Sequence, residues 1–323
     1  MSSLSVNRRP LGASGIQVAP LALGGNVFGW TADEETSFKV LDAFIDRGFN
    51  LVDTANVYSA WAPGHQGGES ETIIGRWFKK SGKRAKTILA TKVGMQMGDK
   101  TQGLSKGNIL RSVEDSLKRL QTDHIDLYQS HKDDPEVPLE ETLQAYDTLI
   151  KQGKVRAIGA SNYTAGRLAQ ALETSQLHKL PAYVTLQPEY NLYDREGFEK
   201  ELEPFCLKHG IGVIGYYALA SGFLTGKYRS QADLGKSVRG QGIGKKYLND
   251  RGMKILAALD EVASAQQTTL TSIALAWLIQ RRSVTAPIVS ATSVDQLEQV
   301  MQSVDVQLTP EQVKKLDDAS AWS

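Results

Sequence analysis

The sequence is poor in cysteine, in net charge and in long apolar runs. Its one cysteine, Cys206, cannot form an internal disulfide and provides no cysteine cluster for a metal ion. The apolar stripe around it indicates a buried structural thiol. Lysine and arginine total 37 against 36 aspartate and glutamate residues, a formal net charge of +1. No overall field therefore favours nucleic acid or an anionic membrane, and we expect a small-molecule partner instead.

Targeting and membrane segments are also missing from the pattern. The first residues, MSSLSVNRRPLGASG, contain no continuous apolar stretch like that of a signal peptide, and no later run has the length needed to cross a bilayer. We therefore expect a cytoplasmic protein. Its 323 residues lie within the range that α/β barrels reach as one domain, so we expect residues 1–323 to form a single domain. Nothing in the sequence indicates the oligomeric state.

Short apolar runs alternate with longer stretches of helical periodicity. Eight runs have the composition of buried strands: APLALGG, NLVDTA, TILATKV, HIDLYQSH, VRAIGAS, YVTLQPEY, IGVIGYYALA and TAPIVSA. Between them, DEETSFKVLDAFIDRG places Phe38, Leu41 and Phe44 on one helical face, and Ser105 stands where it can cap the helix of SKGNILRSVEDSLKRLQ. Strands that are apolar on both faces and alternate with helices indicate a parallel sheet. Eight such units predict an α/β fold, the closed (β/α)8 TIM barrel.

An open dinucleotide-binding sheet is disfavoured, because LGGNVFG lacks the G-x-G-x-x-G spacing and no helix follows it at once. Two additions to the barrel are expected. RPLGASGIQVAP predicts an N-terminal β-hairpin that turns at Ser14 and Gly15, and extra helical segments are expected between the seventh and eighth strands. The connection over residues 220–250 is too long for a simple link, which is typical of a lid or a binding loop.

Four polar residues follow successive strands at the end where active sites of barrels lie. Asp53 and Tyr58 follow the second strand, Lys92 ends the third, and His131 follows the fourth. Each has an ordinary structural explanation when taken alone: a turn cap, amphipathic packing, a solvated amine or a hydrogen-bonded imidazole. Four such residues at one rim of the barrel indicate a catalytic site. An ammonium beside a phenol lowers the phenol's pKa from about 10, which makes Tyr58 a candidate general acid and base. Asp53 would hold Lys92, and His131 would orient a carbonyl oxygen.

The sequence resembles the aldo-keto reductase family in NLVDTANVYS, ATKVG, YQSH, AIGASNY, LQPEYNLYDR and YALASGFLTGKY, which follow one another across nearly the whole chain. The resemblance implies a (β/α)8 barrel that reduces aldehydes and ketones to alcohols with NADPH, or less often NADH, and without a metal ion. It also implies that Asp53, Tyr58, Lys92 and His131 are the catalytic tetrad.

The same resemblance implies how the cofactor is held. Three groups would bind it: Ser161, Asn162, Gln187 and Tyr216 at the nicotinamide; Leu219, Ser221, Lys227 and Arg239, in and beside the clamping loop 220–250, at the pyrophosphate; Ser290, Thr292, Gln296 and Gln299 at the adenosine phosphate and adenine. Several positions depart from the family pattern. Gln299 and Val300 replace the usual acidic or amide pair near adenine, and Tyr217 and Ala218 replace the common Ser-Pro, which would change the floor of the pocket. Ser290 stands where glycine is usual, and Thr292 stands where many members have arginine or lysine. The family resemblance makes NADPH the expected cofactor. Losing that cation weakens the selection for the 2′-phosphate, which makes NADH the alternative.

Trp30 and Trp61 follow the first and second strands and are candidate substrate contacts, which favours an apolar carbonyl compound. Two other functions stay open. The family includes potassium channel β subunits, which retain the barrel and cofactor site but act mainly as regulatory partners. A lyase using Lys92 as a Schiff base would need that lysine neutral in an apolar pocket, and the carboxylate of Asp53 argues against this.

Overall fold

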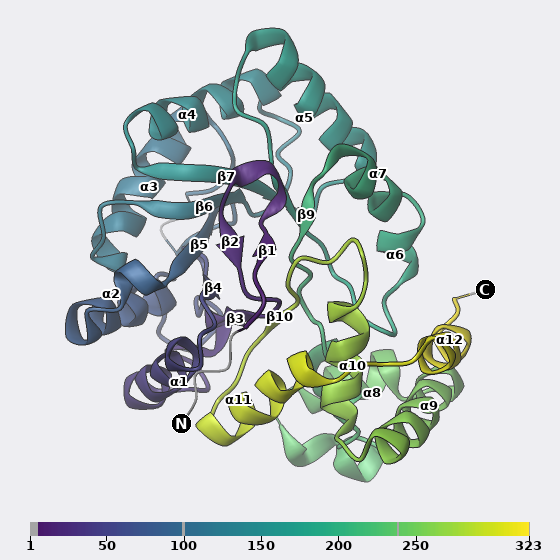
Figure 1. The fold of residues 1–323 in the computed structure, drawn as a ribbon. Helices are drawn as coiled ribbons and strands as arrows, with labels where there is room; N and C mark the ends of the chain where they lie inside the picture. The colour runs from purple at the N-terminus through teal and green to yellow at the C-terminus, as the bar shows by residue number, and fades with distance from the viewer. Residues whose placement is uncertain (1–5, 99–100, 238, 323) are drawn as a thin grey trace.

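The computed structural model describes residues 6–98, 101–237 and 239–322, and its centre is a parallel barrel (Figure 1). Its eight strands, in chain order, are β3 (Ala22–Gly24), β4 (Leu51–Asp53), β5 (Ile88–Val93), β6 (Ile125–Ser130), β7 (Val155–Ser161), β8 (Thr185–Gln187), β9 (Gly212–Val213) and β10 (Ile288–Val289). They pair in the order β10-β3-β4-β5-β6-β7-β8-β9. Backbone bonds of 2.8 Å from Thr285 N to Val213 O and from Ile288 N to Gly215 O connect the two ends. All eight predicted strands and the (β/α)8 architecture are confirmed.

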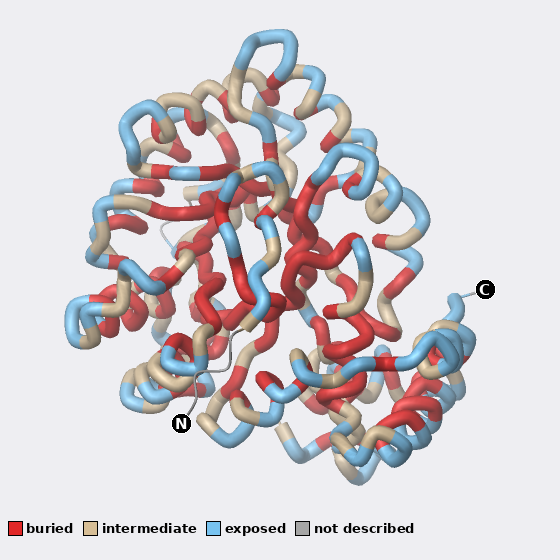
Figure 2. The backbone as a smooth tube through the Cα atoms, viewed as in Figure 1, coloured by how far each residue is buried: buried red, intermediate tan, exposed pale blue. Residues whose placement is uncertain are grey.

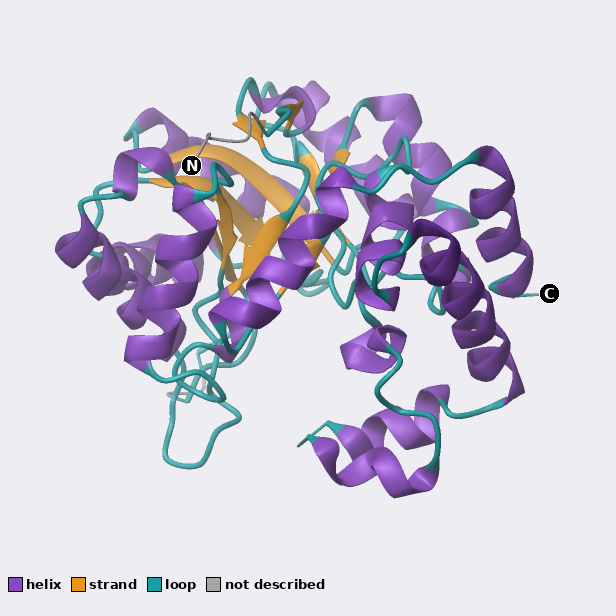
Figure 3. Cartoon of the chain, turned by 60° about the horizontal axis from the view of Figure 1, so that its bottom comes forward, coloured by secondary structure: helices purple, strands orange, loops and turns teal. Residues whose placement is uncertain are grey.

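Helices surround the strands (Figure 3). The α-helices are α1 (Glu34–Asp46), α2 (Glu69–Ser81), α3 (Lys106–Leu120), α4 (Leu139–Lys151), α5 (Ala165–His178), α6 (Glu196–Glu199), α7 (Leu202–His209), α8 (Gly240–Tyr247), α9 (Asp250–Gln266), α10 (Leu270–Ile279), α11 (Val294–Met301) and α12 (Pro310–Ala319). Short 3-10 helices are η1 (Gly12–Ser14), η2 (Gly25–Val27), η3 (Arg84–Lys86), η4 (Ala220–Thr225), η5 (Gln231–Lys236) and η6 (Gln302–Asp305). Within the described ranges, none of the helices is long and apolar enough to cross a membrane.

Local sequence explains where these helices begin. Asp33 accepts a hydrogen bond from Thr36 N at the start of α1, and Ser105 accepts one from Asn108 N at the start of α3, as predicted. Each cap satisfies a backbone donor that has no partner inside its helix. Leu41 of α1 is then fully buried against the sheet. These helices are therefore positioned by their caps and held by their apolar faces.

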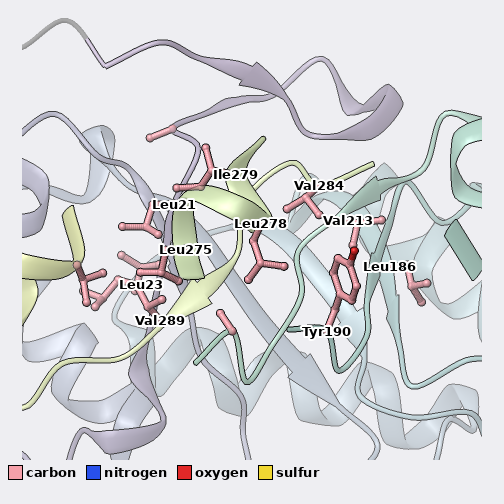
Figure 4. Close-up of a cluster of buried hydrophobic side chains, with 14 of the residues drawn as sticks. Leu21, Leu23, Leu186, Tyr190, Val213, Leu275, Leu278, Ile279, Val284 and Val289 are labelled. Atoms are coloured by element: carbon pink, nitrogen blue, oxygen red, sulfur yellow. The ribbon is translucent and has the colours of Figure 1, made fainter. Parts of the chain in front are cut away.

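The core has two layers of side chains. Figure 2 shows buried segments of the backbone along the strands. The larger layer lies between strands and helices; in Figure 4, Leu23 of β3 and Val289 of β10 gather around Leu275 of α10. The smaller layer contains Leu51, Leu127 and other side chains from the sheet together with apolar residues of the N-terminal hairpin. That hairpin, β1 (Arg9–Pro10) paired antiparallel with β2 (Gln17–Val18), confirms the prediction and covers this layer.

The segment predicted as a loop over residues 220–250 is largely helical in its described part, where it forms η4, η5 and α8. The loop prediction missed two local signals. Ser230 and Asp233 form a capping box at η5, and Ile243 and Tyr247 bury the apolar face of α8. The extra helices expected between the seventh and eighth strands are confirmed by α8, α9 and α10. Cys206 is buried, as predicted, and burial raises the pKa of its thiol to about 12.

Candidate active site

Asp53 and Lys92 form a buried ion pair inside the barrel. Asp53 ends β4 and Lys92 lies in β5, and their side chains are 2% and 0% exposed. The Lys92 Nζ atom donates to Asp53 Oδ2 at 2.6 Å, to the Tyr58 hydroxyl at 2.7 Å and to Thr54 O at 2.8 Å. These three acceptors use all the protons of the ammonium. Lys92 is therefore fully engaged and enclosed, which leaves it no access to a carbonyl carbon for a Schiff base.

His131 follows β6, and its ring lies beside that of Tyr58. Its backbone N–H donates to Val93 O at 2.8 Å, and its ring centroid is 5.9 Å from that of Tyr58. Burial, followed by the charges of Lys92 and Lys132, lowers the pKa of His131 well below its ordinary value. The imidazole is therefore neutral at pH 7 and can donate one N–H. The four predicted rim residues are thus brought together by β4, β5 and β6.

The pKa of Tyr58 moves in the direction opposite to the sequence-based expectation. Burial raises this pKa well above 10, and the Asp53 carboxylate adds to the effect through its charge and a 3.4 Å hydrogen bond. Lys92 was expected to lower it. Asp53 neutralises the ammonium, so a phenolate would be a desolvated second anion beside a carboxylate. Tyr58 is therefore held as a neutral phenol, a form that can give a proton.

A buried glutamine that the sequence prediction missed completes the surroundings of Asp53. Gln129 of β6 is 0% exposed, and its Nε2 donates to Asp53 Oδ1 at 3.2 Å. Gln187 of β8 donates to the same oxygen at 2.9 Å. Gln129 lies two residues before His131, and residues two apart share a face of a strand. That spacing was the available signal.

The residues predicted near the nicotinamide also come together. Ser161 Oγ donates to Gln187 O at 2.9 Å, and Asn162 Nδ2 donates to Ser161 Oγ and to His131 O, each at 3.0 Å. The Tyr216 hydroxyl donates to Asn162 Oδ1 at 2.8 Å. Asn162 has a φ of 57°, a left-handed conformation that is uncommon outside glycine. Ser161, Asn162, Gln187 and Tyr216 together form a polar surface, called the polar ledge below. Gln187 connects it to Asp53 of the ion pair.

The backbone is strained where η4 begins. Ala220, Ser221 and Gly222 have φ values of 48°, 58° and 100°, three left-handed residues in succession, and Leu219 precedes them. Conformations of this kind in non-glycine residues concentrate at ligand sites. A Cβ atom built on Gly222 would lie 3.7 Å from Lys227 Nζ, so this turn and that ammonium are adjacent. Backbone turns of this kind beside a cation are suited to an anionic group.

Residues expected at the adenosine end lie after β10 and in α11. Ser290 Oγ donates to Asn26 Oδ1, so its hydroxyl proton is already used. The backbone N–H and the hydroxyl of Thr292 both donate to Gln296 Oε1 at 3.0 Å, and Gln299 is exposed on α11. The α11 N-terminus remains suited to a phosphate, and Thr292 could donate to one only by releasing Gln296 Oε1.

Aromatic side chains continue outward from Tyr58. The Trp61 ring lies 5.9 Å from the Tyr58 ring and 5.7 Å from the Trp30 ring, in edge-on geometry. Tyr58, Trp61 and Trp30 thus form a continuous aromatic wall. The Arg239 guanidinium lies 5.5 Å from the Trp30 ring centroid, so the residue preceding α8 reaches this wall. Tyr217 is 49% exposed with a φ of 53°. Within the described residues, we find no group of three or more His, Cys, Asp or Glu side chains placed to hold a metal ion.

The fold and this cluster define a class of protein: a (β/α)8 barrel with a buried ionisable site at the ends of its strands. The chain belongs to the aldo/keto reductase family, whose model matches residues 20–321. This is a family of oxidoreductases that generally bind NAD(P)H.

Several named proteins resemble the chain along almost its full length. An uncharacterized oxidoreductase, YrpG, of Bacillus subtilis (strain 168) is 36% identical over 95% of this chain and 94% of its own. The aldo-keto reductase YhdN of the same organism is 32% identical over 98% of this chain and 93% of its own. A putative voltage-gated potassium channel subunit beta of Schizosaccharomyces pombe is 33% identical over 96% and 92%, respectively.

Proposed function

We propose that this protein reduces aldehydes or ketones to alcohols with NADPH, with NADH as the alternative cofactor. The observation that carries the proposal is the Lys92 ammonium, which bonds Asp53 and the Tyr58 phenol at 2.6 and 2.7 Å in a chain of the aldo/keto reductase family. The neutral phenol at the rim is a proton donor that needs no metal ion. The reduced nicotinamide would supply the hydride.

In this proposal each of the four rim residues has its own role in the transfer of the proton. Tyr58 gives its proton to the carbonyl oxygen as negative charge develops there, and the 2.7 Å bond from Lys92 stabilises the phenolate that is left. Asp53 holds the ammonium and keeps the pair neutral overall. His131, neutral because its pKa is lowered by burial, donates to the same carbonyl oxygen and orients it.

The polar ledge fits the carboxamide of a nicotinamide. Ser161, Asn162 and Gln187 would hold the carboxamide, and the partly exposed ring of Tyr216 would lie against the heterocycle. The left-handed turn at Ala220–Gly222, together with Lys227, fits a pyrophosphate. In this proposal the residues 220–250 clamp the cofactor, and Thr292 with the α11 N-terminus receives its adenosine phosphate.

Substrates would enter along the aromatic wall. Trp61 is 48% exposed and lies against Tyr58, while Trp30 extends the same surface. Such a wall favours carbonyl compounds with a flat or apolar substituent over highly charged ones. A cytoplasmic location, where reduced cofactor is plentiful, is part of this proposal.

A regulatory role is the second candidate, because the similar proteins include one named as a potassium channel subunit beta. A protein of that kind would bind the cofactor and respond to its redox state with little turnover. The complete Tyr58, Lys92, Asp53 and His131 cluster favours the enzyme.

A cofactor assay separates these candidates. The purified protein should oxidise NADPH, and less rapidly NADH, in the presence of aldehydes or ketones, as followed by the loss of absorbance of the reduced nicotinamide. Binding without turnover across a broad carbonyl panel, together with a cofactor-dependent protein partner, would favour the regulatory role. No binding of either nucleotide would contradict both.

Carbonyl reduction should depend little on pH from about 6 to 9. Because the pKa of Tyr58 is raised, the phenol keeps its proton throughout this range, and the reduction rate falls only when pH rises through that pKa, above about 10. Because burial lowers the pKa of His131 well below its ordinary value, the imidazole stays neutral at pH 7 and above. The measurement is kcat at saturating cofactor and substrate, with stability at each pH tested by preincubation. A tyrosine-dependent loss centred near pH 7 would contradict this expectation.

A further inference from the structure

Asp53 is held from two sides, and only one side involves the ion pair. Its Oδ2 faces Lys92 and Tyr58, whereas its Oδ1 accepts hydrogen bonds from the amides of Gln129 at 3.2 Å and Gln187 at 2.9 Å. The two amides also bond each other, with Gln187 Nε2 donating to Gln129 Oε1 at 3.2 Å. A carboxylate with donors on both oxygens cannot rotate without losing one set of bonds. The amides therefore fix the direction in which Oδ2 points.

The barrel interior is shaped to hold Gln129 in this position. A Cβ built on Gly159 of β7 would lie 3.1 Å from Gln129 Cγ and 2.2 Å from Thr185 Oγ1. Glycine at position 159 therefore leaves room for the Thr185 hydroxyl first, and any side chain there would also press on Gln129. Gln129 is 0% exposed, so an amide at this depth must find its hydrogen-bond partners inside the protein. One of them is Asp53.

We propose that Gln129 is a positioning residue, which aims the Asp53 carboxylate at Lys92 and thereby sets the Lys92–Tyr58 bond used for proton transfer. The proposal rests on the function proposed above. It also separates two glutamines that are neighbours in space. Gln187 bonds Asp53 but belongs to the ledge proposed for the carboxamide, so cofactor binding competes for its amide. Gln129 lies behind that ledge and holds Asp53 in both states.

The test replaces Gln129 in two ways. Gln129→Met keeps the approximate side-chain shape but removes the donor; we expect kcat to fall at least tenfold, with the cofactor Kd within twofold of the original protein. Gln129→Glu restores a donor only while the new carboxyl is protonated. Its ionisation would place a second negative charge beside Asp53, so kcat should fall as pH rises from 5 to 8. The ionisable groups near this position are Asp53 from β4 and Lys92 from β5, with Tyr58 and His131 at the mouth.

Thr185→Val is the matched control. Thr185 lies in β8, opposite Gly159 of β7; it is as fully buried as Gln129, and its hydroxyl has no hydrogen-bond partner within the described structure. This change should leave kcat within twofold. A Gln129→Met protein with unchanged kcat, or a Gln129→Glu protein whose pH profile parallels the original, would overturn the positioning role.

Failure of the proposed function gives a different result. In that case the unchanged protein reduces no carbonyl, or Tyr58→Phe reduces it equally well. The contact between Gln129 and Asp53 is then tested by the free energy of unfolding of the two variants as a function of pH. A carboxyl at position 129 facing Asp53 has a raised pKa, so the stability of Gln129→Glu should fall as pH rises through it, relative to Gln129→Met. Equal stabilities of the two variants at every pH would overturn the contact itself.

Discussion

Tyr58→Phe should lower the rate of carbonyl reduction by about 10²- to 10⁴-fold, the usual contribution of a general acid. The change removes only the hydroxyl that accepts from Lys92 at 2.7 Å, and it leaves the aromatic ring against Trp61. The carbonyl oxygen then develops negative charge without a proton donor. The measurement is kcat/KM with the preferred carbonyl substrate, alongside a fluorescence titration with NADPH. We expect cofactor affinity to change by less than about threefold, because the proposed cofactor contacts do not include this hydroxyl.

Tyr146→Phe provides the control for Tyr58→Phe. Tyr146 is also a buried tyrosine, but its hydroxyl bonds Ser130 at 2.8 Å in the layer between sheet and helices. Losing that bond should cost about 1 kcal/mol of stability and leave turnover of the folded protein unchanged. Persistence of full activity in Tyr58→Phe would exclude the phenol as the donor. Equal losses in both variants would indicate a general structural effect instead.

Lys92→Met should lower the free energy of unfolding by about 3–5 kcal/mol and abolish most reduction. The substitution leaves the Asp53 carboxylate, 2% exposed, without its cation in the interior of the barrel. It also removes the bond that stabilises the Tyr58 phenolate. Denaturant unfolding at pH 7 measures the first effect, and kcat measures the second.

The double variant Asp53→Asn/Lys92→Met separates charge from shape. Removing both charges should recover more than half of the lost stability while activity stays low, because the ammonium is still absent. Lys39→Met is the surface control: its pair with Glu35 is 2.7 Å long, but the side chains are 64% and 78% exposed. Breaking this exposed pair should change stability far less than Lys92→Met does, because solvent screens both charges. A double variant as unstable as Lys92→Met would mean that the cost is a packing effect.

Much of the architecture was readable from local patterns. The eight strands were predicted because buried parallel strands need continuous apolar runs, and the cap of α3 was predicted because Ser105 precedes an amphipathic stretch. The segment 220–250 was predicted less well. Its many glycines and cations obscured a capping box at Ser230 and the burial of Ile243 and Tyr247, so helices were taken for a loop. The capping box is a local signal that could have been found in the sequence, whereas the burial of Ile243 and Tyr247 depends on contacts that α8 makes in the folded chain.

The sequence by itself determined the barrel and the chemical identity of the rim: an acid, a phenol, an amine and an imidazole after successive strands. Apolar periodicity and residue type are local properties, so they can be read without coordinates. Only the tertiary structure decided which atoms meet and what charge they carry. Burial and the Asp53 carboxylate raise the pKa of Tyr58 where the ammonium alone would lower it. The bond from Gln129 to Asp53, 76 positions apart in the chain, exists only because the barrel brings β6 and β4 to one interior.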